Sequence, residues 1–573
     1  MSAHRVLLLQ VFGVATVVAL TLGLDAQRAQ ACGGFFCSAT QPVNQAAERI
    51  IFASNLDNTV TAVVQIQYSG PSEDFAWVLP VPGIPDVAVS SDLAFQRLQQ
   101  ASNPQYILTT EVEGVCRSDE FLDFNAGSPT SGGTGGSGGG GGEDGVNVLA
   151  EGNVGPYDYV VIQPDASYEN VGDVAVEWLV DEGYDVVPPG GDPASIAELL
   201  GSYLRDQMNL LAFRLTKGNA AGTIRPIWIT YASDRPMIPI RPTAVAANDD
   251  MGVMVWVLGE HRAVPINYLG LELNEALIDW NTGGSNYNQV VIAAANEAGG
   301  QGFVTERAGP NADYDNVVFS EGDERVWENL QSFASTEDSV DLLIESAYAY
   351  GVWDGYEDLV ADFLPDEIPA DEFIACPECR RGELLPISAP AFLTELERDV
   401  VEPMRATQEL LASRPYVTRL YTTMSAPEMD MDPVFDFNPD LSPASNLHNA
   451  VRVIECDPTV FLSEAPSRIE LEDGRVVRIA AGSPWPFTAG SDDAPPANAA
   501  VLELSTSGPG TVVEDNGDAI DAVLEAHNAT VPGRFQLSGG AGCSLSHNRS
   551  APASGLLFVV VIGLALGRRR LLG

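Results

Sequence analysis

Two cysteines in a CxxC spacing, Cys376 and Cys379, are the residues most suited to chemistry by type and spacing. Such a pair binds zinc when a second pair completes the ligand set. It exchanges electrons when a strand precedes it and a helix follows. The sequence has no second CxxC, and an acidic, proline-containing stretch, 362–372, comes before this one. A structural disulfide is therefore favoured, with a redox pair and a metal site as the alternatives.

Four closely spaced carboxylates form the second candidate site, and they are Asp430, Asp432, Asp436 and Asp440. Carboxylates at such spacing hold calcium together with backbone carbonyl groups. The segment is not an EF-hand loop, because Val434 stands where a third ligand belongs and no glycine turn follows. A solvated acidic loop is the commoner outcome for a run of charge. Calcium at Asp430, Asp432 and Asp436 is the weaker alternative, and no other cofactor is expected.

The histidines and the glycine motifs point to no reaction. No HExxH motif or spaced ligand pair includes His261, His448, His527 or His547, so ordinary polar roles are expected for all four. GxGxxG over 133–138 and GxSxG over 135–139 both lie in a low-complexity stretch, without the strand and helix that these motifs require. They are chance matches. A catalytic triad can assemble from distant positions, so a hydrolase with an unrecognised site remains an alternative.

The composition is that of a folded, strongly acidic protein. Hydrophobic residues make up 45% and charged residues 19% of 573 residues, which predicts two to four domains of roughly 150 residues each. The formal net charge is -50. A surface of this sign repels the phosphate backbone, so nucleic acid is not an expected partner.

The N-terminus has the pattern of a secretory signal peptide over residues 1–31. A basic start precedes an apolar core over 6–24, and Ala29 and Ala31 are the small residues of a cleavage site. Cleavage there makes Cys32 the first mature residue. A disulfide at Cys32 is favoured over lipidation, because a glutamine stands between the two alanines where a lipoprotein signal has a small residue.

The C-terminus combines a cysteine, a short apolar run and a basic end. Cys543 precedes an apolar run over 555–567, and Arg568, Arg569 and Arg570 follow it. As a helix the run is roughly 20 Å long, whereas a bilayer core is about 30 Å thick. A sorting signal that is cut and re-anchored is therefore favoured over a plain membrane anchor.

This tail resembles the MYXO-CTERM sorting tail of myxobacterial and related proteins. The resemblance implies processing at Cys543 by a sorting protease and display on the cell surface. Attachment to the membrane would be through the C-terminal helix or a lipid at Cys543. The expected location is the outer membrane or the cell surface, with release as a further outcome.

An exported chain is expected to form disulfides. Once Cys543 is assigned to processing, six cysteines remain, which allows about 15 connectivities. One hypothesis is that the cysteines close together in the sequence form two disulfides. The third disulfide would then close a very long loop. Those pairs are Cys32 with Cys37, Cys376 with Cys379, and Cys116 with Cys456.

The hydrophobic periodicity predicts an α+β fold with a mixed, mostly antiparallel sheet and packed helices. Alternating apolar residues over 47–53, 60–68 and 75–81 predict a three-stranded antiparallel meander with one buried side. Further strands are predicted over 210–215, 225–231, 237–241 and 251–258, and helices over 92–101, 173–182, 288–298, 325–333, 339–350 and 392–411. Pro403 predicts a kink or break in the last helix. Asp192 and Pro193 predict the start of another helix.

Composition also divides the chain. A stretch rich in Gly and Ser reads as a disordered loop inside the main domain, because strand patterns resume after it. The predicted units are a signal peptide at 1–31, a main α+β domain at 32–483 with its glycine-rich loop at 127–145, a spacer or small appendage at 484–554, and a hydrophobic sorting helix with an arginine stop at 555–573.

Several blocks of sequence together carry a second resemblance. They are Ala31–Cys37, Pro42–Ile50, Phe75–Gly83, Val154–Asp158, Trp178–Leu179, Gly183–Tyr184, Ile224–Trp228, Tyr416–Tyr421 and Asp432–Phe435. The set resembles an exported bacterial family called domain of unknown function 2330, from about Cys32 to Cys456. The family implies no activity that could be transferred to particular residues. The sequence therefore favours a binding or envelope-structural role over the alternative of an extracellular hydrolase.

Overall fold

The computed structural model describes residues 35–36, 44–69, 76–117, 146–165, 168–184, 186, 192–215, 225–245, 247–335, 339–353 and 355–531. Helix and strand occur in similar shares and most strand pairings are antiparallel, which confirms the predicted α+β class. Several predicted features lie outside the described residues. They are the signal peptide with Ala29 and Ala31, Cys32, Cys37, the loop at 127–145, His547, Cys543 and the hydrophobic tail with Arg568, Arg569 and Arg570.

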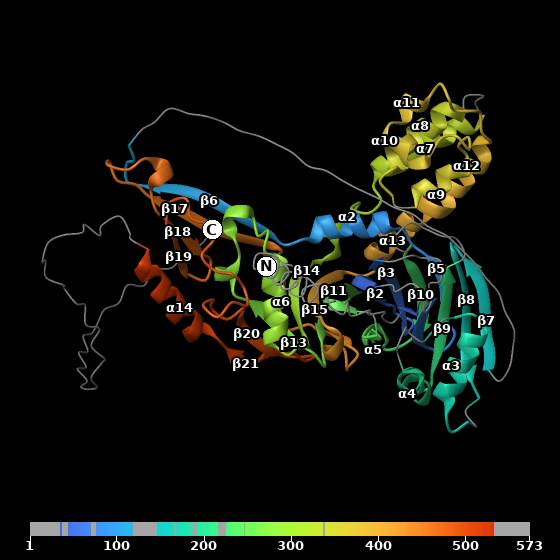
Figure 1. The fold of residues 1–573 in the computed structure, drawn as a ribbon, viewed down its shortest axis with the longest axis horizontal. Helices are drawn as coiled ribbons and strands as arrows, with labels where there is room; N and C mark the ends of the chain where they lie inside the picture. The colour runs from blue at the N-terminus through green and yellow to red at the C-terminus, as the bar shows by residue number, and fades with distance from the viewer. Residues whose placement is uncertain are drawn as a thin grey trace, which may run out of the picture.

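A ten-stranded sheet is the centre of the molecule (Figure 1). Its strand order is β21-β20-β13-β14-β15-β11-β2-β3-β10-β5, and only β11–β2 and β13–β14 are parallel pairings among these strands. The strands are β2 (Asn44–Ser54), β3 (Thr59–Ser69), β5 (Asp86–Val89), β10 (Ile227–Ala232), β11 (Ala247–Gly259), β13 (Leu269–Leu273), β14 (Gly302–Pro310), β15 (Tyr416–Met424), β20 (Asn498–Glu503) and β21 (Thr511–Asp515).

Both faces of this sheet are buried at its centre. Along β11, Val253, Val255 and Val257 face one hydrophobic core, whereas Met254 and Trp256 face another. The prediction of one buried side for the strand over 47–53 was wrong, because Ile50 and Phe52 face the first core, whereas Ile51 and Ala53 face the second, which helices cover. A strand that is buried on both faces carries a continuous apolar run, and β11 has that pattern.

A five-stranded antiparallel sheet packs against the first face. Its order is β1-β4-β9-β8-β7. Trp77, Leu211 and Phe213 point into the core shared with the ten-stranded sheet. Helices α3 and α4 cover the outer face (Figure 1). The elements are β1 (Phe35–Phe36), β4 (Ala76–Pro82), β7 (Val146–Val154), β8 (Tyr157–Pro164), β9 (Met208–Leu215), α3 (Val171–Asp181) and α4 (Pro193–Arg205).

The predicted meander is correct for two of its three strands. β2 and β3 form an antiparallel hairpin. The third strand, β4, pairs with β9 in the other sheet instead of with β3. β10 occupies the free edge of β3 through six residue pairs, from Ile227 with Val64 to Ala232 with Thr59. A partner this distant in sequence cannot be recognised from local periodicity.

A layer of helices covers the second face of the ten-stranded sheet and extends into the cluster at the upper right of Figure 1. At the kink or break predicted near Pro403, a π-helical turn interrupts the α-helix and joins α12 to α13. The elements are α2 (Asp92–Ser102), α7 (Glu321–Ser332), η4 (Phe333–Ser335), α8 (Ser339–Tyr350), α9 (Tyr356–Ala361), α10 (Ala370–Ala375), α11 (Pro377–Arg380), α12 (Ala389–Leu396), the π-helical turn η5 (Glu397–Val401) and α13 (Glu402–Ala412).

A four-stranded sheet forms the opposite end of the molecule, at the left of Figure 1. Its order is β19-β18-β17-β6, and β17 is parallel to β6. It shares a core with α6, with α14 and with β20, so the described part of 484–554 is folded onto the rest of the protein. The elements are β6 (Gln105–Glu113), β17 (Leu447–Glu455), β18 (Ser467–Leu471), β19 (Val476–Ile479), α6 (Tyr287–Glu297) and α14 (Gly517–Thr530).

The remaining elements are short. The strand predicted over 237–241 is wrong, because a short helix, α5, begins at Ile240 and Pro239 and Pro242 cannot donate to a ladder. The elements are α5 (Ile240–Thr243), β12 (Arg262–Pro265), β16 (Phe435–Asn438), η1 (Glu275–Leu277), η2 (Trp280–Thr282), η3 (Asn311–Tyr314), η6 (Ala426–Glu428) and η7 (Leu462–Glu464).

Two of the three hypothesised disulfides are present. Cys376 is joined to Cys379, and Cys116 to Cys456 across a sequence separation of 340. The second bridge follows directly from strand pairing. Glu113 ends β6 opposite Glu455 at the end of β17, and the next residue, Cys456, donates its N–H to the Glu113 carbonyl at 2.8 Å. The parallel strands therefore bring the two cysteines together.

Candidate functional site

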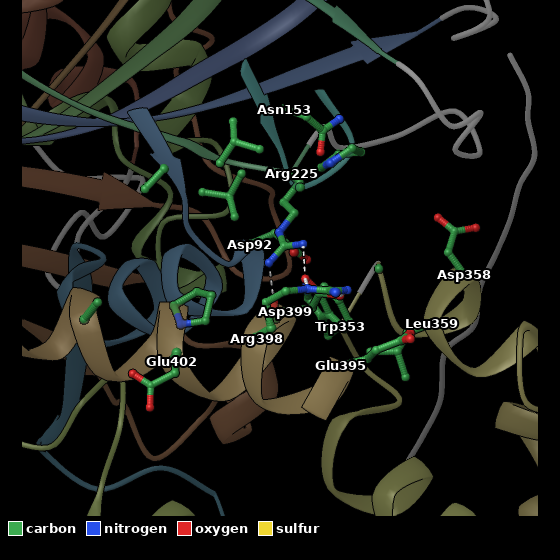
Figure 2. Close-up of a pocket in the computed structure, with 18 of the residues that line it drawn as sticks. Asp92, Asn153, Arg225, Trp353, Asp358, Leu359, Glu395, Arg398, Asp399 and Glu402 are labelled. Atoms are coloured by element: carbon green, nitrogen blue, oxygen red, sulfur yellow. Dashed lines mark hydrogen bonds and ion pairs between the residues drawn. The ribbon is translucent and has the colours of Figure 1, made fainter. Parts of the chain in front are cut away.

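A cleft with a volume of about 780 Å³ lies where the two main sheets meet the helical layer (Figure 2). Strand β5 and the turn between β7 and β8 form part of its wall. Arg225, two residues before β10, forms the next part, and α2, α9, α12, η5 and α13 close the rest. Three layers of the fold therefore contribute to one site.

Arg225 is the centre of this cleft. Its Nη1 donates to Asp399 Oδ1 at 2.8 Å, and its Nη2 donates to the Asp399 carbonyl oxygen at 2.9 Å. Its Nε donates to the Ser90 carbonyl oxygen at 3.3 Å. Only 10% of the Arg225 side chain and 12% of the Asp399 side chain are exposed. The guanidinium thus joins the edge of the sheet to the helical layer through a nearly buried ion pair.

The π-helical turn explains why the Asp399 carbonyl is available. In a regular helix that carbonyl would accept from the N–H of residue 403, four positions later. Pro403 has no N–H, and the backbone widens into a π-helical turn over Glu397–Val401. Arg225 supplies the missing donor. Such turns interrupt α-helices frequently at functional sites.

Arg398 completes the charge arrangement. Its Nε and Nη2 donate to the two carboxylate oxygens of Asp399, at 2.9 and 2.6 Å, while 64% of its side chain is exposed. Burial by itself would raise the pKa of Asp399. The hydrogen bonds from Arg398 and the charge of Arg225 outweigh burial and lower that pKa below its ordinary value. Asp399 is therefore a fixed negative charge at neutral pH.

The turn between β7 and β8 lies close to Arg225. The Tyr157 hydroxyl donates to the Arg225 carbonyl oxygen at 2.6 Å. Gly155 has a φ of 56°, and a Cβ atom there would lie 2.9 Å from Val89 Cγ1 and 3.5 Å from Arg225 Nη1. Only glycine allows this approach without strain. On the other side, the Arg225 guanidinium lies 5.9 Å from the centre of the Trp353 ring.

The lining of the cleft is acidic. Besides Asp399, five carboxylate residues line it, against two arginines, Arg225 and Arg398. Figure 2 shows Asp358, Glu395 and Glu402 on the helices around the Arg225–Asp399 contact. The five carboxylate residues are Asp92, Asp358, Asp362, Glu395 and Glu402. The excess of carboxylates makes the cleft attractive to a cation.

Replacing Asp399 by asparagine is expected to lower the free energy of unfolding by about 3 kcal/mol at neutral pH, because Arg225 keeps a buried charge without its partner. A lowered carboxyl pKa contributes stability above the ordinary value of 3.8, and this is lost as the pH falls through the lowered pKa. The variant should therefore lose less stability than the wild type between neutral pH and about pH 3. Urea unfolding at both pH values measures this. Asp362→Asn, in the same wall, is the control and should cost under about 0.5 kcal/mol; equal losses in both variants would contradict the assignment.

One family model matches the chain over residues 26–320, about half of the 573 residues. Its description reads "uncharacterized protein conserved in bacteria", and the family is domain of unknown function 2330 (DUF2330). The chain belongs to this family. Comparison with curated proteins and with solved structures gave no significant match. Two sequence blocks of the DUF2330 resemblance, Val154–Asp158 and Ile224–Trp228, lie within the match and provide Gly155 and Arg225 to the cleft.

The DUF2330 match ends earlier than the predicted resemblance. It includes the glycine-rich stretch but not Tyr416–Tyr421 or Asp432–Phe435. Even so, β15 pairs with β14 on one side and β11 on the other, inside the ten-stranded sheet. The folded unit therefore extends beyond residue 320.

The predicted calcium residues have separate partners. Asp432 accepts hydrogen bonds from the Tyr203 hydroxyl, at 2.9 and 2.7 Å to its two oxygens. Asp436 pairs with Arg235 at 2.7 Å, and Asp430 accepts from Gln301 at 2.6 Å. Among the described residues, no three His, Cys, Asp or Glu side chains are grouped as a metal site. Calcium binding here stays a prediction.

Sequence reasoning missed Arg225, Trp353 and Asp399 as site residues. Arg225 and Asp399 are 174 residues apart, so their spacing carries no signal. Pro403 was the one local sign, because a proline inside a helical pattern frees a carbonyl group. Within the described ranges, no helix is long and apolar enough to cross a bilayer.

Proposed function

We propose that this DUF2330 protein is displayed outside the bacterial cell and binds a positively charged ligand in the cleft around Arg225 and Asp399. The proposal depends on one observation, that a cleft of about 780 Å³ is lined by more carboxylates than arginines around a fixed ion pair. Ligand sites usually have volumes of about 300–1,000 Å³. The Arg225–Asp399 contact makes the wall rigid, and rigid walls reduce the entropy lost on binding.

Two observations support a location outside the cytoplasm. The chain forms two disulfides, and disulfides persist in oxidising compartments. The terminal sequences have the patterns of a signal peptide and a sorting tail. Mass spectrometry of the protein recovered from its cells should find an N-terminus at Cys32 and a C-terminus processed at Cys543. Untrimmed polypeptide in the cytosol with reduced thiols would contradict the proposal.

The binding role is tested by titrating the protein calorimetrically with spermidine and with tetralysine. The test variant, Asp362→Asn with Glu395→Gln, removes two charges from the cleft wall. The matched control, Glu357→Gln with Glu397→Gln, removes two charges from the same helical region outside the lining. We expect the test variant to weaken binding about tenfold, which is about 1.4 kcal/mol, and the control to change it less than about twofold.

The control variant distinguishes binding in the cleft from general attraction of cations to the acidic surface. A protein with a net charge of -50 collects cations everywhere on its surface. Equal weakening by both double variants would mean that the cations bind without a site. That result would reject the cleft as the ligand site while leaving the proposed location untouched.

A further inference from the structure

Strand β6 is an edge strand that lacks the usual protection against pairing with another chain. It forms one edge of the four-stranded sheet and pairs with β17 over 9 residues in continuous register (Figure 1). The other sheet edges in the described part of the chain are protected. Strands β7 and β21 carry register shifts, and β1, β5, β12, β16 and β19 have no more than 4 residues each. Short edges and bulges prevent pairing with another chain, and β6 has neither feature.

Two hydrogen bonds show which backbone groups of β6 face away from β17. The Gln105 N–H donates at 2.7 Å to the residue that precedes β17, and the Glu113 carbonyl oxygen accepts at 2.8 Å from the residue that follows it. The N–H and C=O groups of successive strand residues point alternately to the two sides. The odd-numbered residues of β6 therefore face β17. Leu108, Thr110 and Val112 direct their N–H and C=O groups to the free edge.

The side chains along this edge are open to solvent. Every residue from Ile107 to Val115 is exposed except Leu108, which is half-buried. Ile107 is 43%, Val112 53% and Val115 70% exposed, although all three are apolar. Isoleucine, valine and threonine favour paired strands. The segment thus has the side chains of an inner strand, but no described strand pairs with its second edge.

Strand β6 is fixed at both of its ends. At its start, Tyr106 is buried, and its ring centre lies 5.1 Å from that of Trp280 and 4.7 Å from that of His448. Shortly after its end, the disulfide between Cys116 and Cys456 holds the chain. An edge that is already ordered loses little entropy when another strand pairs with it.

The charge of the edge indicates which kind of strand fits it. Glu111 and Glu113 are exposed and lie on the same face of β6. Glu113 pairs with Arg468 at 2.7 Å, whereas none of the described ion pairs includes Glu111. A second copy of the chain would bring the same carboxylates and another net charge of -50. Opposite charges on neighbouring strands stabilise the pairing and like charges destabilise it, so a basic strand is favoured over a second copy.

We propose that β6 is a docking edge for an extended, basic segment of another protein, which adds a strand antiparallel to β6. Main-chain hydrogen bonds join it to Leu108, Thr110 and Val112, and a basic residue lies opposite Glu111. Main-chain bonds give such added strands their affinity, and side chains give them specificity. Antiparallel pairing is the more stable orientation per residue. The edge shares no residue with the cleft around Arg225, so it is independent of the proposed cation site.

The probe is the labelled peptide Lys-Val-Arg-Thr-Thr-Val-Thr, whose residues lie in this order opposite Glu113 to Ile107. Fluorescence anisotropy with the full chain should show saturable binding. In the antiparallel pairing, the N–H of the central threonine points at Thr110. N-methylation of that nitrogen should weaken binding at least about tenfold. The matched control carries the methyl group on the following threonine, whose N–H points away from β6, and should differ less than about twofold from the unmodified peptide.

Substitutions in β6 test the same pairing from the protein side. Thr110→Pro removes an outward N–H and no hydrogen bond to β17, and it should weaken binding at least about tenfold. Thr110→Val keeps the N–H and should bind like the wild type. Glu111→Gln should weaken binding about threefold, because it removes the charge opposite the peptide arginine. A melting curve of each variant shows that it is folded.

Four results would overturn the proposal. The first is no binding of the peptide by the wild type at about 1 mM. The second is equal binding of a scrambled peptide of the same composition, which would mean general attraction to the acidic surface. The third is an equal effect of the two N-methyl groups, because main-chain pairing requires a difference. The fourth is a dimer of the chain alone that Thr110→Pro dissociates in the ultracentrifuge, because a second copy would then occupy the edge.

Discussion

Replacing Cys116 and Cys456 together by serine lowers the free energy of unfolding by about 5 kcal/mol. The disulfide closes a loop with a sequence separation of 340, and a longer loop means a larger loss of entropy in the unfolded chain. The bridge also joins the ends of the parallel strands β6 and β17, where Cys456 is fully buried. Urea unfolding of the oxidised wild type and the double variant measures the difference.

The second disulfide is the internal control for this result. Cys376 and Cys379 are separated by only 3 positions, so the same entropy model predicts a loss of about 2 kcal/mol for their double serine variant. They also lie at the surface of the helical layer, and Cys379 is exposed. A loss from this pair as large as that from Cys116 and Cys456 would mean that loop length does not determine the effect.

Replacing Arg419 by methionine lowers the free energy of unfolding by about 4 kcal/mol. Arg419 is 1% exposed and Glu306 is 3% exposed, and the two form an ion pair at the centre of the fold. Arg419 also donates to Ser102 Oγ at 2.9 Å and to Asn103 Oδ1 at 2.9 Å. Its removal leaves a buried carboxylate without its cation and frees the C-terminus of α2.

The pH dependence of this variant identifies the cause. Burial raises the pKa of Glu306, and the charge of Arg419 opposes that rise. Without Arg419 the folded state takes up a proton at Glu306 more readily than the unfolded state does. The stability deficit of Arg419→Met should therefore be smaller at about pH 5 than at about pH 8.

An exposed ion pair provides the matched control. Arg325 and Glu321 are 71% and 89% exposed and lie 3.7 Å apart on one helix. Arg325→Met should cost under about 0.5 kcal/mol. Adding Glu306→Gln to Arg419→Met should restore part of the loss, because no unpaired charge remains buried. Equal losses for Arg419→Met and Arg325→Met would show that burial of the pair has little effect.

Local sequence patterns predicted the helices and strands that are determined by interactions between nearby residues. Helix α8 was predicted with the bounds that the structure has, Ser339–Tyr350. Helix α4 begins with Pro193 after Asp192, whose carboxylate accepts from the Ala194 N–H at 3.1 Å. Caps and helical periodicity depend on residues within a few positions of each other, so the chain specifies them before it folds.

Pairings between residues far apart in the sequence were not predicted. The alternating pattern of β4 correctly indicated a strand, but not that Trp77 pairs with Phe213 of β9. The same is true of the Glu306–Arg419 pair, where a buried acid and a buried base look like surface residues in the sequence. A strand can pair with any free sheet edge, and a buried charge can be neutralised by any opposite charge. Composition therefore does not decide which partner is chosen.

By itself the sequence predicted the α+β class and the DUF2330 family, and two of the three cysteine pairs that it suggested are present. Only the tertiary structure decided where a ligand could bind. Arg225 and Asp399 meet because β10 docks on β3 and because Pro403 opens the helix beside them. Such a site depends on contacts between residues far apart in the sequence, and only the packed chain decides those contacts.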